Sequence, residues 1–140
     1  MFDQKYEDRL SSWSCLRQSL EVSTTPLKDL IEAYDHAPRV SIHTDPWDKA
    51  TWPSPWELVL ENQYCQFCIV LGMAYSLQLT ERFKGSNFEI HIGIDRDSKE
   101  QYYLLFVNNH ILGWNNTCID RSELPQSFVS QTVYTLDPLQ

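Results

Sequence analysis

The chain has 140 residues, of which 42% are hydrophobic, 13% aromatic and 21% charged, and its formal net charge is −8. The apolar content is typical of a globular protein, and the length suits one domain with a single core. An acidic chain without a basic run is not expected to bind nucleic acid directly, because phosphate contacts need a basic face.

Helical periodicity marks the first third of the chain, where two helices are predicted. The second of them has Pro26 at its first helical position, and a short β-like piece over residues 39–43 follows it. Together, residues 1–43 form a predicted N-terminal helical extension. The first helix is predicted over residues 2–20 from apolar side chains three and four positions apart, namely Phe2, Tyr6, Leu10, Trp13, Leu16 and Leu20.

The middle of the chain carries two further helix signals. A capped helix begins at Ser54, with Pro55 at the first helical position and Glu57 completing a capping box. After a break, a central helix is predicted over residues 65–80, and its apolar residues lie on every side. A helix of this kind is buried and contacts several layers of a core.

Three strand candidates follow the helices, over residues 88–95, 101–108 and 110–114, and residues 128–136 form a further candidate. Helices first and an antiparallel meander afterwards are typical of the α+β class. We therefore predict a single α+β domain in which a buried, cysteine-bearing helix packs on a small antiparallel sheet. Its core covers residues 44–115, and residues 116–140 form a C-terminal segment.

Cys65 is the candidate catalytic nucleophile. It lies at the first turn of the central helix, where the helix dipole and free backbone N–H groups favour a thiolate. Such a thiol also needs a base within hydrogen-bond reach and a group that orients the base. His91, on the first strand after the helix, is the candidate base, and His110 opens the third strand.

The strand that carries His91 is predicted to turn this histidine away from Cys65. Phe88, Ile90 and Ile92 share one face of the strand, and His91 lies on the other. Because the apolar face must cover the central helix, the imidazole is expected to face outward.

The run Pro55-Trp56-Glu57-Leu58, the cysteine-bearing helix and the three-strand meander resemble the transglutaminase-like cysteine proteinase fold over residues 52–114. The resemblance implies a transglutaminase or papain-like core with Cys65 at the position of the nucleophile. The whole chain also resembles small proteins of contractile-tailed bacteriophages that infect marine cyanobacteria.

The same resemblance implies a histidine at the start of the second strand after the nucleophile helix and an aspartate near the end of the third. Those positions fall near Gln101-Tyr102 and near Trp114-Asn115, and neither holds the required residue type. The Gly-Asp that precedes the family's cysteine is replaced by Gln63-Tyr64. These departures predict a degenerate member of the family, a pseudoenzyme in which Cys65 is a small buried hydrophobe.

Other readings of the cysteines and acids are less favoured. Cys65 and Cys68 form a Cys-x-x-Cys, but no strand precedes it as in a thioredoxin-like motif, and no second pair of ligands completes a zinc site. Asp45, Asp48 and Glu57 lack a recognisable metal-binding loop. We predict no metal and no cofactor.

Trp47, Trp52 and Trp56 are the candidate partner-binding residues. Aromatic residues beside Pro and Asp commonly anchor an irregular loop, and they also form hot spots of protein–protein interfaces. A ligand-stacking platform is the remaining alternative. The C-terminal segment could either dock on a neighbouring subunit as an added strand or close the sheet of its own domain, which is favoured.

The function predicted from these observations is that of a non-catalytic structural or assembly protein of a tailed phage particle, in the neck, tail or baseplate. Its expected partners are other virion proteins or copies of itself, with no membrane and no direct nucleic acid. The expected location is the virion, after synthesis in the host cytoplasm, and otherwise the cytoplasm, since no secretory signal or framework of disulfides is visible. The alternative is an active cysteine hydrolase or acyltransferase, with Cys65 as nucleophile and His91 or His110 as an unconventional base. A third possibility is an infection-stage protein that binds a host factor through the tryptophan loop.

Overall fold

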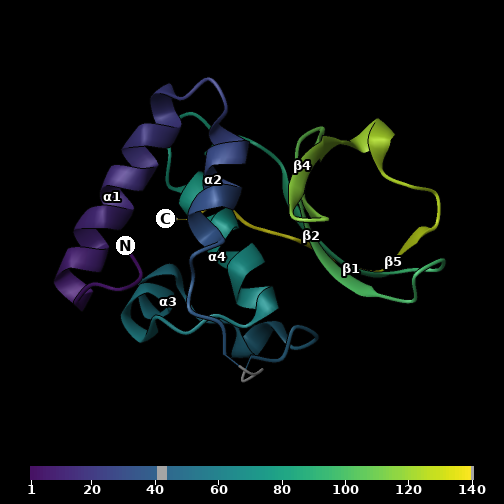
Figure 1. Cartoon of the computed structure of the whole chain (residues 1–140), viewed down its shortest axis with the longest axis horizontal. Helices are drawn as coiled ribbons and strands as arrows, with labels where there is room; N and C mark the ends of the chain where they lie inside the picture. Colours follow the sequence, from purple (N-terminus) through teal and green to yellow (C-terminus); the bar gives the residue numbers. More distant parts are fainter. Residues whose placement is uncertain (41–43, 140) are drawn as a thin grey trace.

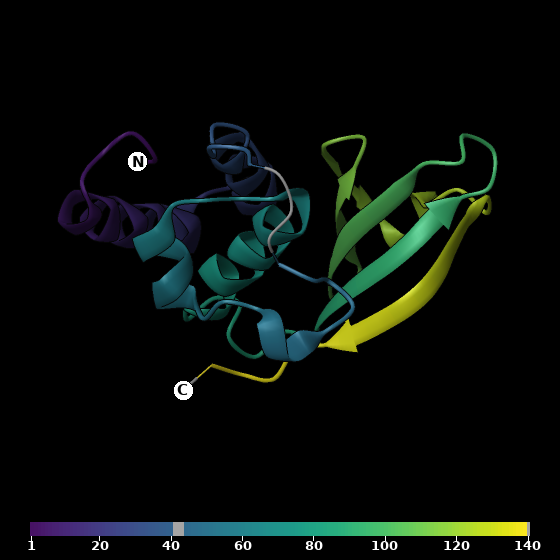
Figure 2. The same ribbon diagram turned by 90° about the horizontal axis from the view of Figure 1, so that it is seen from below.

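The computed structural model describes residues 1–40 and 44–139. Within these residues, four α-helices form one layer, and a curved five-stranded antiparallel sheet forms the other (Figures 1 and 2). The helices come first in the chain and the strands follow. The α+β class predicted from the sequence is therefore confirmed.

The helical layer is built around α4, which lies between α1 and the sheet (Figure 1). Nearly every residue of α4 from Phe67 to Gln78 is buried, as predicted for a helix that is apolar on all sides. The helices are α1 (Tyr6–Val22), α2 (Pro26–Tyr34), α3 (Pro55–Glu61) and α4 (Gln66–Gln78), with a 3₁₀ turn η1 (Lys49–Thr51) before α3.

Helix α3 begins with the predicted capping box. The Ser54 hydroxyl accepts a hydrogen bond from the Glu57 N–H at 3.2 Å, and the Glu57 carboxylate accepts one from the Ser54 N–H at 3.1 Å. Pro55 occupies the first turn, where its missing N–H has no intrahelical partner to lose. These contacts fix where the chain turns into α3 and, through it, where α4 can begin.

The sheet has the strand order β4-β3-β2-β1-β5, with every neighbouring pair antiparallel. The turn between β2 and β3 is made by two asparagines, and Asn108 adopts a left-handed φ of 53° that this residue tolerates well. The strands are β1 (Phe88–Asp95), β2 (Gln101–Val107), β3 (His110–Trp114), β4 (Thr117–Asp120) and β5 (Phe128–Thr135), with a 3₁₀ turn η2 (Arg121–Glu123) after β4.

The C-terminal part of the chain belongs to this sheet. Strand β4 was not predicted, and the boundary drawn after residue 115 falls inside the β3–β4 hairpin. Strand β5 pairs with β1, so it closes the sheet of its own domain, which was the favoured alternative.

Both faces of the sheet are covered. The inner face, which is the face toward α4, includes Ile90, Ile92 and Leu105 and belongs to the main core. The outer face, which is the opposite one, carries a second, smaller core. Figure 1 shows how this arises, because the sheet curls and the segment from β4 to β5 passes over its outer face. The buried members of the second core are Leu104, Phe106, Ile111 and Phe128.

The β-like piece predicted over residues 39–43 is described in part. Arg39 forms an isolated parallel bridge with Tyr64, and the Val40 N–H donates to the Tyr64 carbonyl at 3.1 Å. Residues 41–43 lie outside the described residues. Over the described ranges, no helix is both long enough and apolar enough to cross a membrane.

Candidate functional site

Cys65 is the N-cap residue of α4. Helix α3 ends at Asn62, whose left-handed backbone (φ 52°) reverses the chain, and Cys65 is extended, with φ −74° and ψ 170°. Its sulfur accepts a hydrogen bond from the Cys68 N–H at 3.4 Å. The thiol thus takes the place that a serine or aspartate oxygen commonly holds at a helix N-terminus.

A pocket of about 310 Å³ opens beside Cys65. Its other walls come from α4, from the segment around Pro46 and from the start of β2, where Gln101 and Tyr103 point toward the helix layer. Cys65 itself is only 2% exposed. On the β2 side, the groups that face this pocket are therefore the carboxamide of Gln101 and the phenol of Tyr103.

Tyr103 is held firmly in this wall. Its hydroxyl donates to the Gln101 side-chain oxygen at 3.4 Å, and its ring meets Phe67 edge to face at 5.5 Å. Burial, with a smaller contribution from nearby Cys65 and Asp45, raises the pKa of Tyr103. A phenol with a raised pKa is a poor base near neutral pH, because it holds its proton more tightly than usual.

Cys68 lies one turn further along α4 and is fully buried. Its thiol donates to the Thr44 hydroxyl at 3.5 Å. The side-chain hydrogen bond with Cys65 and burial both raise the pKa of the Cys68 thiol. Neither cysteine takes part in a disulfide. Cys68 is therefore held as a neutral thiol.

The structure does not bring His91 to Cys65. His91 lies on the outer face, where Nδ1 is 2.7 Å from the Ser130 hydroxyl and Nε2 is 3.1 Å from a Glu89 carboxylate oxygen. Its ring stacks on Phe106, with 3.7 Å between the ring centroids. The outward orientation predicted from the strand alternation is confirmed.

The other described histidines are also remote from the pocket at Cys65. His110 Nδ1 is 3.3 Å from an Asp120 carboxylate oxygen at the edge of the sheet, and His36 lines a separate cavity beside the N-terminus. His43 lies outside the described residues. In the described ranges 1–40 and 44–139, no histidine lines the pocket at Cys65.

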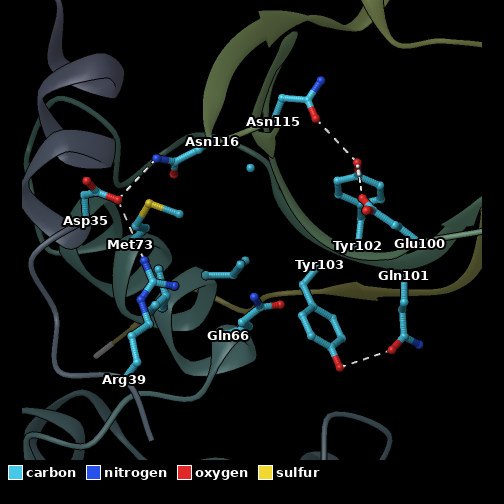
Figure 3. A pocket seen from close by; sticks show the side chains of 13 residues that line it. Asp35, Arg39, Gln66, Met73, Glu100, Gln101, Tyr102, Tyr103, Asn115 and Asn116 are labelled. Carbon is cyan, nitrogen blue, oxygen red and sulfur yellow. Dashed lines mark hydrogen bonds and ion pairs between the residues drawn. The ribbon is translucent and has the colours of Figure 1, made fainter. Parts of the chain in front are cut away.

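A larger cleft of about 610 Å³ adjoins this pocket and shares Gln66, Gln101 and Tyr103 with it (Figure 3). We call the pocket and the cleft together the α4–β2 groove. Figure 3 shows Met73 and Gln66 on the helical side and the Asn115-Asn116 turn on the sheet side. The sequence did not predict this groove.

A polar clasp spans one end of the α4–β2 groove. The Asn116 side-chain amide donates to an Asp35 carboxylate oxygen at 3.3 Å, and Arg39 is 3.8 Å from the same oxygen (Figure 3). This contact ties the β3–β4 turn to the end of α2. Gln101 and Asn115, at the positions where the resemblance implies a histidine and an aspartate, both line the groove.

The three tryptophans have different environments. Trp52 packs between Phe67 and Tyr134, with ring centroids 4.9 Å apart in each case, so it anchors its loop to both layers. Trp47 and Trp56 are 47% and 52% exposed. Trp56 keeps one edge against Trp13 at 5.5 Å. A single aromatic platform formed by Trp47, Trp52 and Trp56 is therefore absent, and the exposed pair remains available for contacts.

The acidic residues considered for a metal instead accept backbone hydrogen bonds in a turn or at a helix start. Asp45 accepts a hydrogen bond from the Trp47 N–H at 2.9 Å, Asp48 accepts one from the Ala50 N–H at 3.1 Å, and Glu57 belongs to the capping box. In the part of the chain that the structure describes, no group of three or more metal-ligating side chains is found.

Among the described residues, the α4–β2 groove faces Cys65 with the carboxamide of Gln101 and the phenol of Tyr103. Comparisons of the chain with protein families, with curated proteins and with solved structures found no match.

Proposed function

We propose that the protein is a non-catalytic structural or assembly protein of a tailed bacteriophage particle, built on a degenerate transglutaminase-like fold. The observation that carries the non-catalytic part is the wall opposite Cys65, which presents Gln101 and Tyr103. The element order supports the scaffold, since a capped helix leads into a cysteine-bearing helix that packs on an antiparallel meander. Assignment to a particle rests on the sequence resemblance.

The described wall of the α4–β2 groove supports the non-catalytic proposal. A cysteine nucleophile needs a base that can take up its proton, and a carboxamide such as Gln101 does not titrate in water. Tyr103 has a raised pKa, and His91 lies across the sheet. A buried thiol in this setting contributes packing and a helix cap.

The surface supplies features suited to binding other proteins of the particle. Trp47 and Trp56 expose large aromatic area, which is a common component of interface hot spots. The clasp of Asp35, Arg39 and Asn116 places charged and amide groups at the rim of the α4–β2 groove. These features suit contacts in which shape and hydrogen bonding decide the partner.

Membership of a particle is tested by mass spectrometry of purified virions from cells that produce the protein. We expect peptides of this chain to remain with the particles through density-gradient purification, at a ratio to the major tail proteins that is constant across fractions. Their absence from intact particles, with the protein still present in the lysate, would remove the structural assignment and leave an assembly factor to be sought in unfinished particles.

The active cysteine hydrolase remains the second candidate, and the position of Cys65 at the N-terminus of α4 favours it. Iodoacetamide labelling near neutral pH, followed by peptide mass spectrometry, separates the two. Exposed Cys15 is an internal reference in the same chain. We expect Cys65 to react much more slowly than Cys15, whereas faster labelling of Cys65 than of Cys15 would indicate an activated thiolate and restore the enzyme.

A further inference from the structure

The outer edge of β5 is an unprotected sheet edge. Within the described residues, β5 pairs only with β1, and Figure 2 shows it as the outer strand of the sheet. Its eight residues, Phe-Val-Ser-Gln-Thr-Val-Tyr-Thr, include no charged residue and no proline. Natural proteins usually blunt such edges with charge, proline or short strands. The opposite edge is of that kind, because β4 has four residues and ends at Asp120.

The backbone groups that face outward from β5 follow from the hydrogen bonds at its two ends. The Leu136 N–H donates inward to the Phe88 carbonyl at 2.9 Å, and the Ser127 carbonyl accepts from the Arg96 N–H at 2.9 Å. Alternate residues of an antiparallel strand direct their N–H and C=O groups to opposite sides. The residues that direct these groups to the open edge are therefore Phe128, Ser130, Val133 and Thr135.

A bulge in the middle of β5 would ordinarily hinder the addition of another strand. The β1–β5 register shifts so that Ile92 is opposite Thr132 and Gly93 is opposite Ser130, which leaves Gln131 as the extra residue. The outward-facing groups are consequently three residues apart at Ser130 and Val133, and two apart elsewhere. A regular incoming strand cannot match this spacing.

A second copy of β5 can match it. When two β5 strands run antiparallel over their full length, the two-fold axis passes between Gln131 and Thr132. Ser130 then faces Val133 of the second copy, and the long interval of one strand lies opposite the long interval of the other. All these outward-facing residues lie on the outer face, so each pair also keeps its side chains on one face of the joined sheet.

The side chains and charges favour the same occupant. Val129 is 40% exposed and Val133 is 46% exposed, and both would be covered by the added strand. The chain carries a net charge of −8, so two copies repel each other in general. The uncharged β5 edge is a place where they can meet with little direct repulsion.

We propose that two copies of this chain associate through their β5 strands, about a two-fold axis between Gln131 and Thr132, to form one continuous ten-stranded sheet. This homodimer is a property of the isolated chain and does not depend on the function proposed above. Phe128 contributes one hydrogen bond less than a regular pair, since its N–H already donates to the Pro125 carbonyl at 3.1 Å. The association is therefore expected to depend on concentration.

The first experiment is sedimentation equilibrium of the full chain over a wide concentration range. We expect the mass to rise from that of one chain, 16.5 kDa, to twice that value. Val133→Pro removes an outward-facing donor and leaves the β1–β5 ladder intact, and Val133→Lys places a charge on the edge. Both variants are expected to remain monomeric at concentrations that dimerise the wild type. Val22→Lys, at an 82% exposed position on α1, is the matched control and should dimerise normally.

The second experiment is amide hydrogen exchange of the wild type below and above the dimerisation midpoint. The amides of Ser130, Val133 and Thr135 are expected to become protected at high concentration, while the inward-facing amide of Tyr134 is protected throughout. A monomer mass at every concentration up to the solubility limit would overturn the proposal. Dimers that persist in both Val133 variants, or protection that appears at β4 instead, would overturn it equally.

Discussion

The two faces of β1 and β2 are built differently although both are buried. The inner face packs on α4 and forms the larger, almost wholly apolar core that contains Cys65 and Cys68. The outer face combines a small apolar cluster with a polar network. There, a Glu89 carboxylate oxygen is 3.1 Å from His91 and 3.5 Å from Arg121, whose guanidinium lies over the Phe106 ring at 4.7 Å. The two thiols and His91 therefore belong to different cores.

This difference shows that a candidate nucleophile on a helix and a candidate base on the following strand can be separated by the sheet. Cys65 and His91 are separated by the sheet itself, because neighbouring residues of a strand point to opposite faces. A single shift of register would have moved His91 to the inner face. The apolar row of Phe88, Ile90 and Ile92 prevents that shift, since the shift would remove these side chains from the main core against α4.

The largest expected effect comes from shortening one buried side chain on each face of β2. Leu104 and Leu105 are adjacent, identical and both 0% exposed, and they point into the outer and the inner core respectively. Leu→Ala substitutions in a core cost about 2–5 kcal/mol, depending on how far the surroundings collapse. We expect Leu105→Ala to lie at the upper end of that range and Leu104→Ala at the lower end, in urea unfolding followed by circular dichroism.

The difference between these two variants is the informative quantity. The smaller outer core can relax around the missing side chain, since the segment from β4 to β5 covers it without a helix. A Leu104→Ala variant as stable as the wild type would show that the outer cluster contributes no core, and the two-core description would have to be abandoned.

A smaller effect is expected from acid, and it concerns the outer face alone. The hydrogen bond with His91, together with the nearby charges of His91 and Arg121, lowers the pKa of Glu89. Because the folded value lies below the unfolded one, the ionised carboxylate stabilises the fold above about pH 4.3, and this contribution is lost as the pH falls through the folded value. For a carboxylate that is 31% exposed, the contribution is expected to be below about 1 kcal/mol.

Glu89→Gln provides the measurement of this contribution. The free energy of unfolding of the variant should be lower than that of the wild type at neutral pH, and the gap should narrow as the pH falls below about 4.3 and through the lowered pKa of the folded state. A gap that stays constant with pH would mean that Glu89 acts through packing and not through its charge.

Much of the fold could be predicted because its signals are local. The capping box of Ser54 and Glu57 and the alternation in β1 specify their elements within a few residues. Strand β4 was missed because Thr117–Asp120 is short and lies at an edge, where one face is partly exposed and the alternation is weak. The outer core was missed for a related reason, since its buried members come from three strands, β2, β3 and β5, and meet only because the sheet curls.

The position of the candidate nucleophile could be predicted from the sequence, but the shape of the α4–β2 groove could not. The position of Cys65 at the start of α4 follows from the break after α3 and the apolar run that succeeds it. The α4–β2 groove depends on Asp35, Gln66, Gln101 and Asn116, which lie far apart in the sequence and meet only through tertiary packing. No local pattern joins an amide on a strand to a carboxylate at the end of a distant helix.

The last prediction is that a substitution on the outer face leaves the labelling rate of Cys65 unchanged, and it tests the separation of the two faces directly. His91→Asn removes the imidazole from the network with Glu89 and Ser130 on the outer face. Since the sheet lies between this network and the thiol, the iodoacetamide labelling rate of Cys65 should stay unchanged at every pH. Tyr103→Ala is the matched variant on the inner face, where removing the phenol opens the pocket beside Cys65 and should raise the rate. A fall in Cys65 labelling in the His91 variant alone would mean that the imidazole reaches the thiol, and the two faces would then form one site.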